Sequence, residues 1–344
     1  TMINHQSLIA TKAARVVNAA RGDGIMEFGL RRAQGPDAGT YGARAAMIGG
    51  CIGTSNVLTG QLFDVPVLGT HAHSWIMSFP DEYTAFKTYA KMYPDACTLL
   101  VDTYDTLKSG VPNAIRVFKE MRKDKVLNGR YGIRLDSGDL AYLSKEARKM
   151  LDAAGFYDAV ISASSDLDEY LIDSLKTQGA KITSWGVGTN LITSKDCPAF
   201  GGVYKLAAVK QGDGEFVPKI KLSENTEKIT NPGNKTVYRI YEKSNGKLKA
   251  DLIALVDDKF DESKDLVIFD PQETWKKTHL KGGKGKCVYT SPSVMDIREH
   301  CINEQATLWD ETRRLVNPHE VYVDLSDRLY KMKTDLLNKM HPEE

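Results

Sequence analysis

Six short apolar runs recur through the first two hundred residues, and helical patterns separate them. The runs span residues 25–29, 65–69, 98–102, 131–135, 159–163 and 181–187, and the clearest helical patterns span residues 80–93, 108–122, 140–154 and 167–178. Strands that alternate with helices at this spacing predict a parallel sheet with crossover helices. Ser109 and Asp166 are candidate N-caps of two of these helices, and Gly155 and Gly179 are candidate C-terminal caps.

Clusters of polar residues follow nearly every one of these runs, at residues 31–32, 70–73, 102–105, 134–139, 164–166 and 186–189. An open doubly wound sheet concentrates its site at one switch point, whereas a barrel collects side chains from all its strands at one mouth. Because six runs contribute polar residues, the sequence favours an α/β-barrel over residues 1–200.

The pattern changes from about Gly201 onwards. Strand-like runs at residues 203–209, 216–222, 237–242 and 252–256 are separated by turn signals, and the tail at residues 293–340 is helical and charged. We therefore predict a second region over residues 201–344, β-rich and then helical. The basic run at residues 281–286 lacks the order of a P-loop and is interpreted as a solvated loop.

Charge and composition exclude several classes of partner and location. The 344 residues carry a net charge of +1, which gives no electrostatic reason to expect nucleic acid or an acidic membrane surface. No apolar run approaches the ~20 residues of a membrane span, and the helical N-terminus lacks the apolar core of a secretory signal. Five cysteines without C-x-x-C spacing fit a reducing cytoplasm.

The run at residues 131–135 ends in charged side chains. Arg134, Asp136 and Asp139 lie at its end, and Gly138 permits a tight turn into a helix. Two carboxylates beside an arginine suit ribose hydroxyls and an anionic substrate. The alternative is a strand-end ion pair with an aspartate that caps the helix.

Two later loops have the composition of phosphate sites. Ser164 and Ser165 follow one run, and Gly186, Gly188 and Thr189 follow the next, each before a helix. Backbone N–H groups at a helix start, beside small residues, bind anions. Together with the carboxylates above, these loops suggest a phosphorylated sugar.

Residues 27–39 add positive charge and an aromatic ring. Arg31 or Arg32 can face the barrel mouth, where a guanidinium matches a diphosphate or a carboxylate. Phe28 either stacks on a flat ring or fills the core.

His71 and His73 leave three interpretations open. A His-x-His pair is a metal-ligand pattern of barrel hydrolases, but the other histidines lie outside the barrel strands. A single histidine could instead act as an acid–base or accept a phosphoryl group, or be structural.

Segments through most of the chain resemble the nicotinate phosphoribosyltransferases. They are EFGLRRAQGPDAG, GTSNVLTGQLFDVPVLGTHAHS, IRLDSGDL, GVGTNLITS, GGVYKL and PKIKLSENTEKITNPGNK, in this order. The resemblance implies an irregular, incomplete TIM-like barrel. It also implies that nicotinate and phosphoribosyl pyrophosphate form nicotinate mononucleotide and pyrophosphate, with hydrolysis of ATP and with Mg²⁺ on the phosphates.

The resemblance also implies roles for individual residues. His73, in the family's G-T-x-A-H motif, would be phosphorylated by ATP, and Thr70 and Arg134 would contact nicotinate. Thr189 would contact the sugar phosphate. For the chemistry that this implies, Asp136 can hold the ribose hydroxyls. The related nicotinamide enzymes suggest that Phe28 stacks on the pyridine and Arg31 binds pyrophosphate. Ser55 stands where those enzymes have an aspartate. An aspartate would repel a carboxylate, so Ser55 favours nicotinate over its amide.

The family further implies a cytoplasmic homodimer whose active site lies at the subunit interface. It also implies a region before residue 1 with a tyrosine that reaches the partner's nicotinate site. The alternatives are a nicotinamide or other pyridine phosphoribosyltransferase, a metal-dependent barrel hydrolase, and a sugar-phosphate binding module without turnover.

Overall fold

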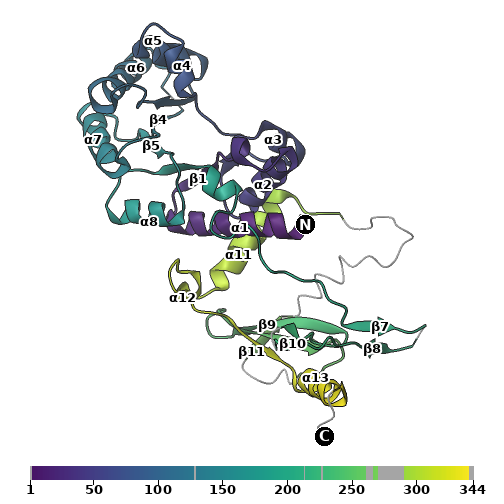
Figure 1. Cartoon of the computed structure of the whole chain (residues 1–344). Helices are drawn as coiled ribbons and strands as arrows, with labels where there is room; N and C mark the ends of the chain where they lie inside the picture. The colour runs from purple at the N-terminus through teal and green to yellow at the C-terminus, as the bar shows by residue number, and fades with distance from the viewer. Residues whose placement is uncertain are drawn as a thin grey trace. The chain divides into compact units, whose positions relative to one another are not determined.

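The structure is a computed structural model that describes residues 2–127, 129–212, 214–225, 228–260, 266–269 and 290–340 (Figure 1). It divides into two compact units, one of Thr1–Phe200 with Ser293–Ile302 and one of Gly201–Pro292 with Asn303–Glu344. Residues 293–302 thus belong to the barrel unit and not to a single C-terminal region. The solvated loop expected at residues 281–286 lies outside the described residues.

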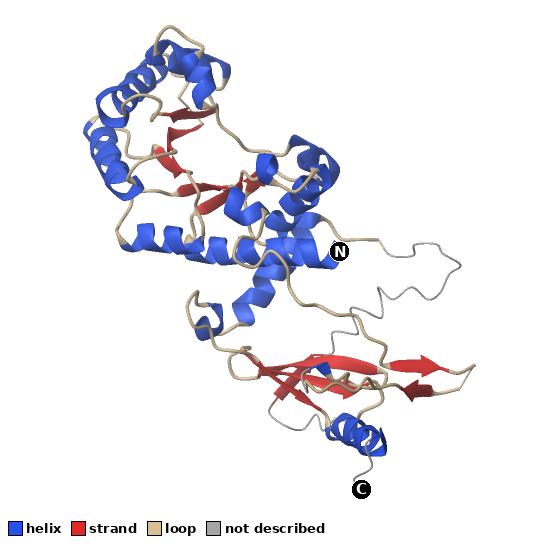
Figure 2. Cartoon of the chain, viewed as in Figure 1, coloured by secondary structure: helices blue, strands red, loops and turns tan. Residues whose placement is uncertain are grey.

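The first unit is built on a parallel sheet that curls without closing (Figure 2). Its strands are β1 (Gly24–Glu27), β2 (Gly53–Thr54), β3 (Ala96–Leu100), β4 (Arg130–Leu135), β5 (Val160–Ala163) and β6 (Ser184–Val187). Their order is β2-β1-β6-β5-β4-β3, so β2 and β3 form the two open edges. The irregular, incomplete α/β-barrel expected from the sequence is therefore confirmed.

Helices surround the sheet on its outer side (Figure 1). The longer ones are α1 (Met2–Ala19), α2 (Pro36–Ile48), α5 (Glu82–Met92), α6 (Val111–Lys123), α7 (Leu140–Ala153) and α8 (Glu169–Thr177). The apolar side chains of α6 recur every three or four residues, and the face they form is buried. Short helices α3 (Val57–Phe63), α4 (His73–Met77) and α9 (Thr189–Ile192), a 3-10 turn η1 (Leu30–Arg32) and a π-helical turn η2 (Thr106–Gly110) complete the unit.

Asp105 and Asp168, and not the expected Ser109 and Asp166, are the N-caps of η2 and α8. Asp105 accepts from the backbone of Leu107 and Lys108 before η2, and Asp168 accepts from Leu171 N in α8. The expected caps Ser109 and Asp166 are wrong by four and two residues. The expected C-terminal caps hold, because Gly155 and Gly179 adopt the left-handed φ values of +80° and +76°.

The strand expected at residues 65–69 is also wrong. Only Val67 pairs there, in an isolated bridge to Thr54, and Gly53–Thr54 forms the edge strand β2. Pro66 has no N–H to extend the ladder, although its carbonyl accepts from Thr54 N at 3.0 Å.

The second unit contains an antiparallel hairpin and a mixed sheet. The hairpin is β7 (Ala208–Lys210) with β8 (Phe216–Pro218), and the sheet order is β11 (Leu266–Phe269), β9 (Lys235–Glu242), β10 (Leu248–Leu255), β12 (Tyr322–Leu325). Helices α12 (Asp310–Arg313) and α13 (Asp327–Met340) belong to it, and α11 (Val294–Thr307) begins in the first unit. The β-rich region is confirmed, but Val203 and Tyr204 lie outside any strand and are exposed.

Candidate active site

A polar cavity of about 460 Å³ lies at the carboxyl ends of the barrel strands. It is lined by residues at the carboxyl ends of five strands and by residues of the turns and short helices between elements: Phe28, Arg31, Arg32, Ala72, His73, Leu100, Arg134, Asp136, Ser164, Ser165, Asp166, Gly186, Gly188 and Thr189. The carboxyl ends of barrel strands are where enzymes of this architecture place their catalytic groups. The cavity brings together ten of the thirteen site residues that the sequence suggested.

Arg134 is the centre of the polar network in this cavity. Its Nε donates to Ser164 Oγ at 2.9 Å, and its Nη1 donates to Thr70 Oγ1 at 2.5 Å. Its Nη2 lies 3.3 Å from Asp136 Oδ1, which also accepts from the Ser164 hydroxyl. Three partners therefore hold the guanidinium, and the Arg134 side chain is 16% exposed and lines the cavity.

His73 is the first residue of α4 and faces two carboxylates. Its Nδ1 lies 3.0 Å from Thr103 Oγ1. Its Nε2 lies 3.6 Å from Asp136 Oδ2 and 3.8 Å from Asp102 Oδ1, and the side chain is 37% exposed. One ring nitrogen is thus oriented by a hydroxyl, and the other is directed at the acidic side of the cavity.

His71 is separated from His73 because the chain turns between them. It is 8% exposed and packs edge-on against Tyr89, with ring centroids 4.6 Å apart. Its Nε2 accepts from the backbone N–H of Leu100 at 3.3 Å, and burial lowers its pKa to about 4. Within the part of the chain that the structure describes, no three His, Cys, Asp or Glu side chains form a metal-ligand group.

Phe28 faces the cavity instead of the barrel core. Its backbone N–H continues the β1–β6 pairing by donating to Val187 O at 2.8 Å, and its ring centroid lies 5.9 Å from Arg134 Cζ. A Cβ on Gly186 would approach the Phe28 ring to 2.6 Å. The glycine therefore makes room for the ring against β6.

The two serine and glycine loops lie side by side in the cavity wall. Asn190 Nδ2 joins them, because it donates to Asp166 O at 2.8 Å and to Leu167 O at 3.1 Å. Ser165 and Asp166 have φ values of +101° and +34°, which are unusual for residues other than glycine. Small side chains and a constrained backbone leave the loop surface accessible to a ligand.

Three suggested residues do not line this cavity. Thr70 contacts it through Arg134. Ser55 follows β2, where its N–H donates to Glu27 O at 3.0 Å. Asp139 is the N-cap of α7 and accepts from Tyr142 N at 3.0 Å, so the alternative interpretation as a helix cap describes it.

Asp102 is a site residue that the sequence analysis did not single out. Its Oδ2 accepts from Asp136 N at 2.8 Å and from Ser137 Oγ at 2.7 Å. Its Oδ1 is buried without a hydrogen-bond partner, and the side chain is 2% exposed. The sequence signal that could have identified Asp102 is its place in the polar cluster at residues 102–105.

A half-barrel with a polar cavity at the carboxyl ends of its strands is the architecture of a barrel-type enzyme. Residues 24–212 match the nicotinate phosphoribosyltransferase (NAPRTase) family, and residues 234–333 match the nicotinate phosphoribosyltransferase C-terminal domain. The chain is 50% identical to nicotinate phosphoribosyltransferase of Bacillus subtilis over 98% of its length and 70% of that protein. The chain therefore belongs to the nicotinate phosphoribosyltransferase family.

Solved structures agree with this assignment. The crystal structure of human nicotinic acid phosphoribosyltransferase superposes with a TM-score of 0.73 at 28% identity, over 96% of this chain and 74% of that one. A nicotinate-nucleotide pyrophosphorylase from Pyrococcus furiosus shares the fold, with a TM-score of 0.65 at 23% identity over 88% and 71% of the two chains. In the described part of the chain, no helix is both long and apolar enough to span a membrane.

Proposed function

We propose that this protein transfers the phosphoribosyl group of phosphoribosyl pyrophosphate to nicotinate, forming nicotinate mononucleotide and pyrophosphate. Its membership of the family and the fixed guanidinium of Arg134 in the polar cavity support this proposal. Each turnover is coupled to the reaction of one ATP with one water, which gives ADP and phosphate.

Arg134 and Phe28 are the proposed ring-binding residues. A guanidinium held by Thr70, Ser164 and Asp136 is preorganised to bind the nicotinate carboxylate, because little side-chain freedom remains to be lost. The Phe28 ring, 5.9 Å from Arg134 Cζ, is close enough to stack on a pyridine bound there.

The sugar phosphate is assigned to the two joined loops. Ser164, Ser165, Gly186, Gly188 and Thr189 line the cavity, and backbone N–H groups beside small side chains suit a phosphate. Asp136 is the proposed partner of the ribose hydroxyls. Arg31, exposed on η1, is the proposed partner of the departing pyrophosphate, whose charge grows as the glycosidic bond breaks.

His73 is the proposed phosphoryl acceptor. With Nδ1 oriented by Thr103, the Nε2 lone pair attacks the γ-phosphorus of ATP, and the bond to ADP breaks. Water later cleaves the phosphohistidine to phosphate. The negative charge of the phosphoryl group on His73 would lie beside Asp102 and Asp136. Phosphorylation by ATP would therefore change the electrostatic potential at the sugar site.

The carboxylates also fit Mg²⁺. Asp102 offers a buried oxygen without a hydrogen-bond partner, and Asp136 lies beside it. Mg²⁺ takes one or two carboxylates together with substrate phosphates and would neutralise phosphate charge here. These two residues are the ones that would hold it.

The assay is product analysis with nicotinate, nicotinamide and quinolinate, each with and without ATP. We expect nicotinate mononucleotide with nicotinate, stimulated by ATP. Turnover of nicotinamide instead would establish a nicotinamide phosphoribosyltransferase, and binding without any turnover would establish a sugar-phosphate binding module. The family resemblance also supports a cytoplasmic homodimer with its active site at the subunit interface.

A further inference from the structure

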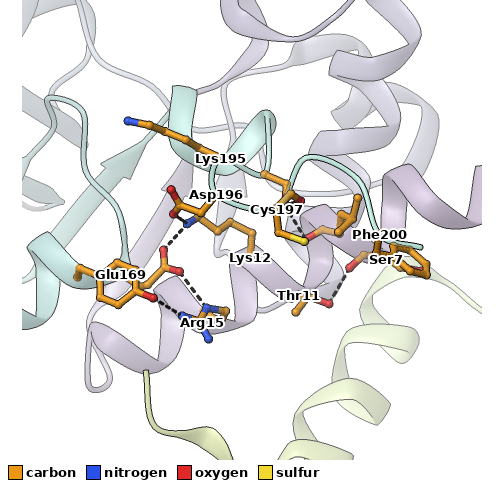
Figure 3. A pocket seen from close by; sticks show the side chains of 12 residues that line it. Ser7, Thr11, Lys12, Arg15, Glu169, Lys195, Asp196, Cys197 and Phe200 are labelled. Atoms are coloured by element: carbon orange, nitrogen blue, oxygen red, sulfur yellow. Dashed lines mark hydrogen bonds and ion pairs between the residues drawn. The ribbon is translucent and has the colours of Figure 1, made fainter. Parts of the chain in front are cut away.

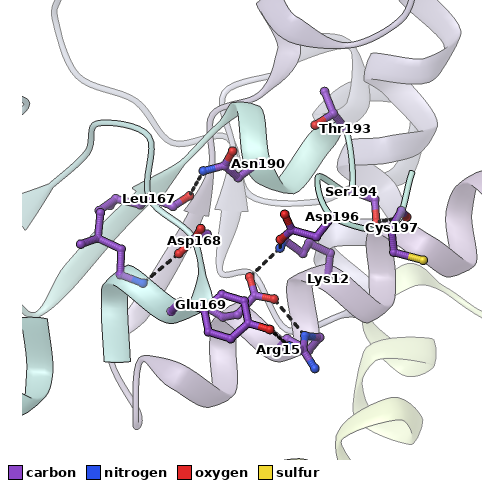
Figure 4. A network of polar contacts seen from close by, with 12 residues as sticks. Lys12, Arg15, Leu167, Asp168, Glu169, Asn190, Thr193, Ser194, Asp196 and Cys197 are labelled. Carbon is purple, nitrogen blue, oxygen red and sulfur yellow. Dashed lines mark hydrogen bonds and ion pairs between the residues drawn. The ribbon is translucent and has the colours of Figure 1, made fainter. Parts of the chain in front are cut away.

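A partly buried ion-pair cluster joins α1 to the start of α8 and to the turn that follows α9 (Figure 4). Lys12 Nζ, from α1, lies 2.7 Å from Glu169 Oε2 and 3.0 Å from Asp196 Oδ2. Arg15 Nε, one turn further along α1, lies 2.9 Å from Glu169 Oε1. The Lys12 and Glu169 side chains are only 5% and 2% exposed.

The two acidic partners of Lys12 are the anchors of the two loops. Glu169 is the first residue of α8, which directly follows the loop with Ser164 and Ser165. Asp196 follows α9, which the other loop opens at Gly188 and Thr189. One ammonium group of α1 therefore joins the start of α8, after the first loop, to the turn after α9, which the second loop precedes.

Residues other than glycine adopt left-handed φ values close to both acidic partners of Lys12. Ser194 and Asp196 have φ values of +45° and +80°, and the Ser165–Asp166 pair in the other loop is also left-handed. Conformations of this kind persist only where the surroundings hold them. Burial opposes the charge on Lys12, but its bonds to Glu169 and Asp196 raise its pKa overall, so the charge is retained.

The Lys12 cluster has room around it. Lys12, Glu169 and Asp196 line a cavity of about 470 Å³, together with Arg15, Cys197 and Phe200 (Figure 3). A longer side chain at position 12 can extend into this space, which provides a charge-conserving variant.

We propose that Lys12 is a positioning residue for phosphoribosyl pyrophosphate, which sets the spacing of the two loops that bind its 5′-phosphate. This inference rests on the proposed function. Neither Lys12 nor its ion-pair partners Glu169 and Asp196 line the active-site cavity, so Lys12 acts through the segments that carry these two partners. Loops fixed in advance lose less freedom when the phosphate binds.

The test compares four variants by steady-state kinetics and by calorimetric binding of phosphoribosyl pyrophosphate. Lys12→Met should raise the KM for phosphoribosyl pyrophosphate roughly tenfold and leave the KM for nicotinate within about twofold. Lys12→Arg should restore much of the affinity. Asp196→Asn changes a side chain that is 58% exposed, so the variant should fold normally and give a smaller rise in this KM.

Arg21→Met is the matched control. Arg21 lies just after α1, and its Nη2 pairs with Asp173 Oδ1 of α8 at 2.6 Å. Asp173 is four residues beyond Glu169, and both side chains are about half exposed. It should leave both KM values unchanged. Equal KM rises for both substrates in Lys12→Met, or no rise in Lys12→Met and Asp196→Asn, would overturn the proposal. A wild-type protein that makes no nicotinate mononucleotide would overturn the proposed function instead.

Discussion

The His71 side chain accepts a backbone hydrogen bond from Leu100, which lies on the edge strand β3. Its Nε2 lies 3.3 Å from Leu100 N. Because Nε2 accepts this hydrogen bond, it carries no proton, and the ring is neutral with its proton on Nδ1. The same segment carries Thr70 to Arg134 and His73 to Thr103, so this hydrogen bond secures the chain between two site residues.

Stability should therefore fall in acid through His71. Burial lowers its pKa from 6.5 to about 4, so the unfolded chain binds the proton more readily. The stability that neutral His71 contributes is fully present above pH 6.5 and is lost as the pH falls towards 4. The free energy of unfolding should fall by about 3 kcal/mol over this range. Urea unfolding of His71→Leu should show a shallower pH dependence over this range.

The control for this prediction is His71→Gln, which keeps an acceptor for Leu100 N–H without a titrating group. At pH 7 we expect it to be more stable than His71→Leu by about 1–3 kcal/mol, the cost of a buried N–H without a partner. An unchanged slope with pH in both variants would show that other groups cause the acid sensitivity.

Arg134→Lys should weaken nicotinate binding. A lysine cannot reproduce the forked contact with a carboxylate, and it cannot keep all three of the partners that hold Arg134. We expect the KM for nicotinate to rise about 10- to 100-fold, with little change in melting temperature. Arg130→Lys, at the exposed start of the same strand, serves as the control. A normal KM for nicotinate would assign Arg134 to the sugar phosphate or to a structural role.

Gly188→Val should raise the requirement for phosphoribosyl pyrophosphate. The first added carbon already comes within 3.1 Å of Phe28 O, and a branched side chain would project over the phosphate loop. We expect at least a tenfold rise in the KM for phosphoribosyl pyrophosphate, on the order of one lost charge-assisted hydrogen bond. A ligand-bound crystal structure with the 5′-phosphate elsewhere would refute the assignment.

His73→Asn should abolish acid-labile labelling by γ-labelled ATP and uncouple ATP from synthesis. The sugar-binding groups lie on other strands, so some uncoupled transfer should remain. His300→Asn, on α11 outside the cavity, should label like the wild type. Label that persists in His73→Asn would place the phosphoryl group on another residue.

The sequence predicted the barrel because strand, helix and polar cluster alternate locally, and this order is visible without tertiary contacts. It misplaced the caps of η2 and α8, because several polar residues compete near each helix start and backbone geometry decides among them. It also predicted a strand at residues 65–69 whose apolar pattern is real but whose pairing is limited to Val67.

At the site, the sequence identified the residues of local motifs and missed those defined by distant contacts. Arg134, His73 and the loop residues stand in recognisable clusters after strands. Asp139 belonged to such a cluster yet serves as a cap. Lys12 gave no signal, because its partners lie 157 and 184 positions along the chain and only the fold brings them together.

Arg134 takes its three partners from three separate segments of the chain, which limits how the protein can change during evolution. Losing Thr70, Ser164 or Asp136 frees the same guanidinium, so the first loss should cost most and later ones less. A lineage that acquires a new ring substrate would have to alter several of these positions together. Single-substitution libraries screened for altered substrate choice should therefore yield few hits at these positions, whereas paired libraries should yield more.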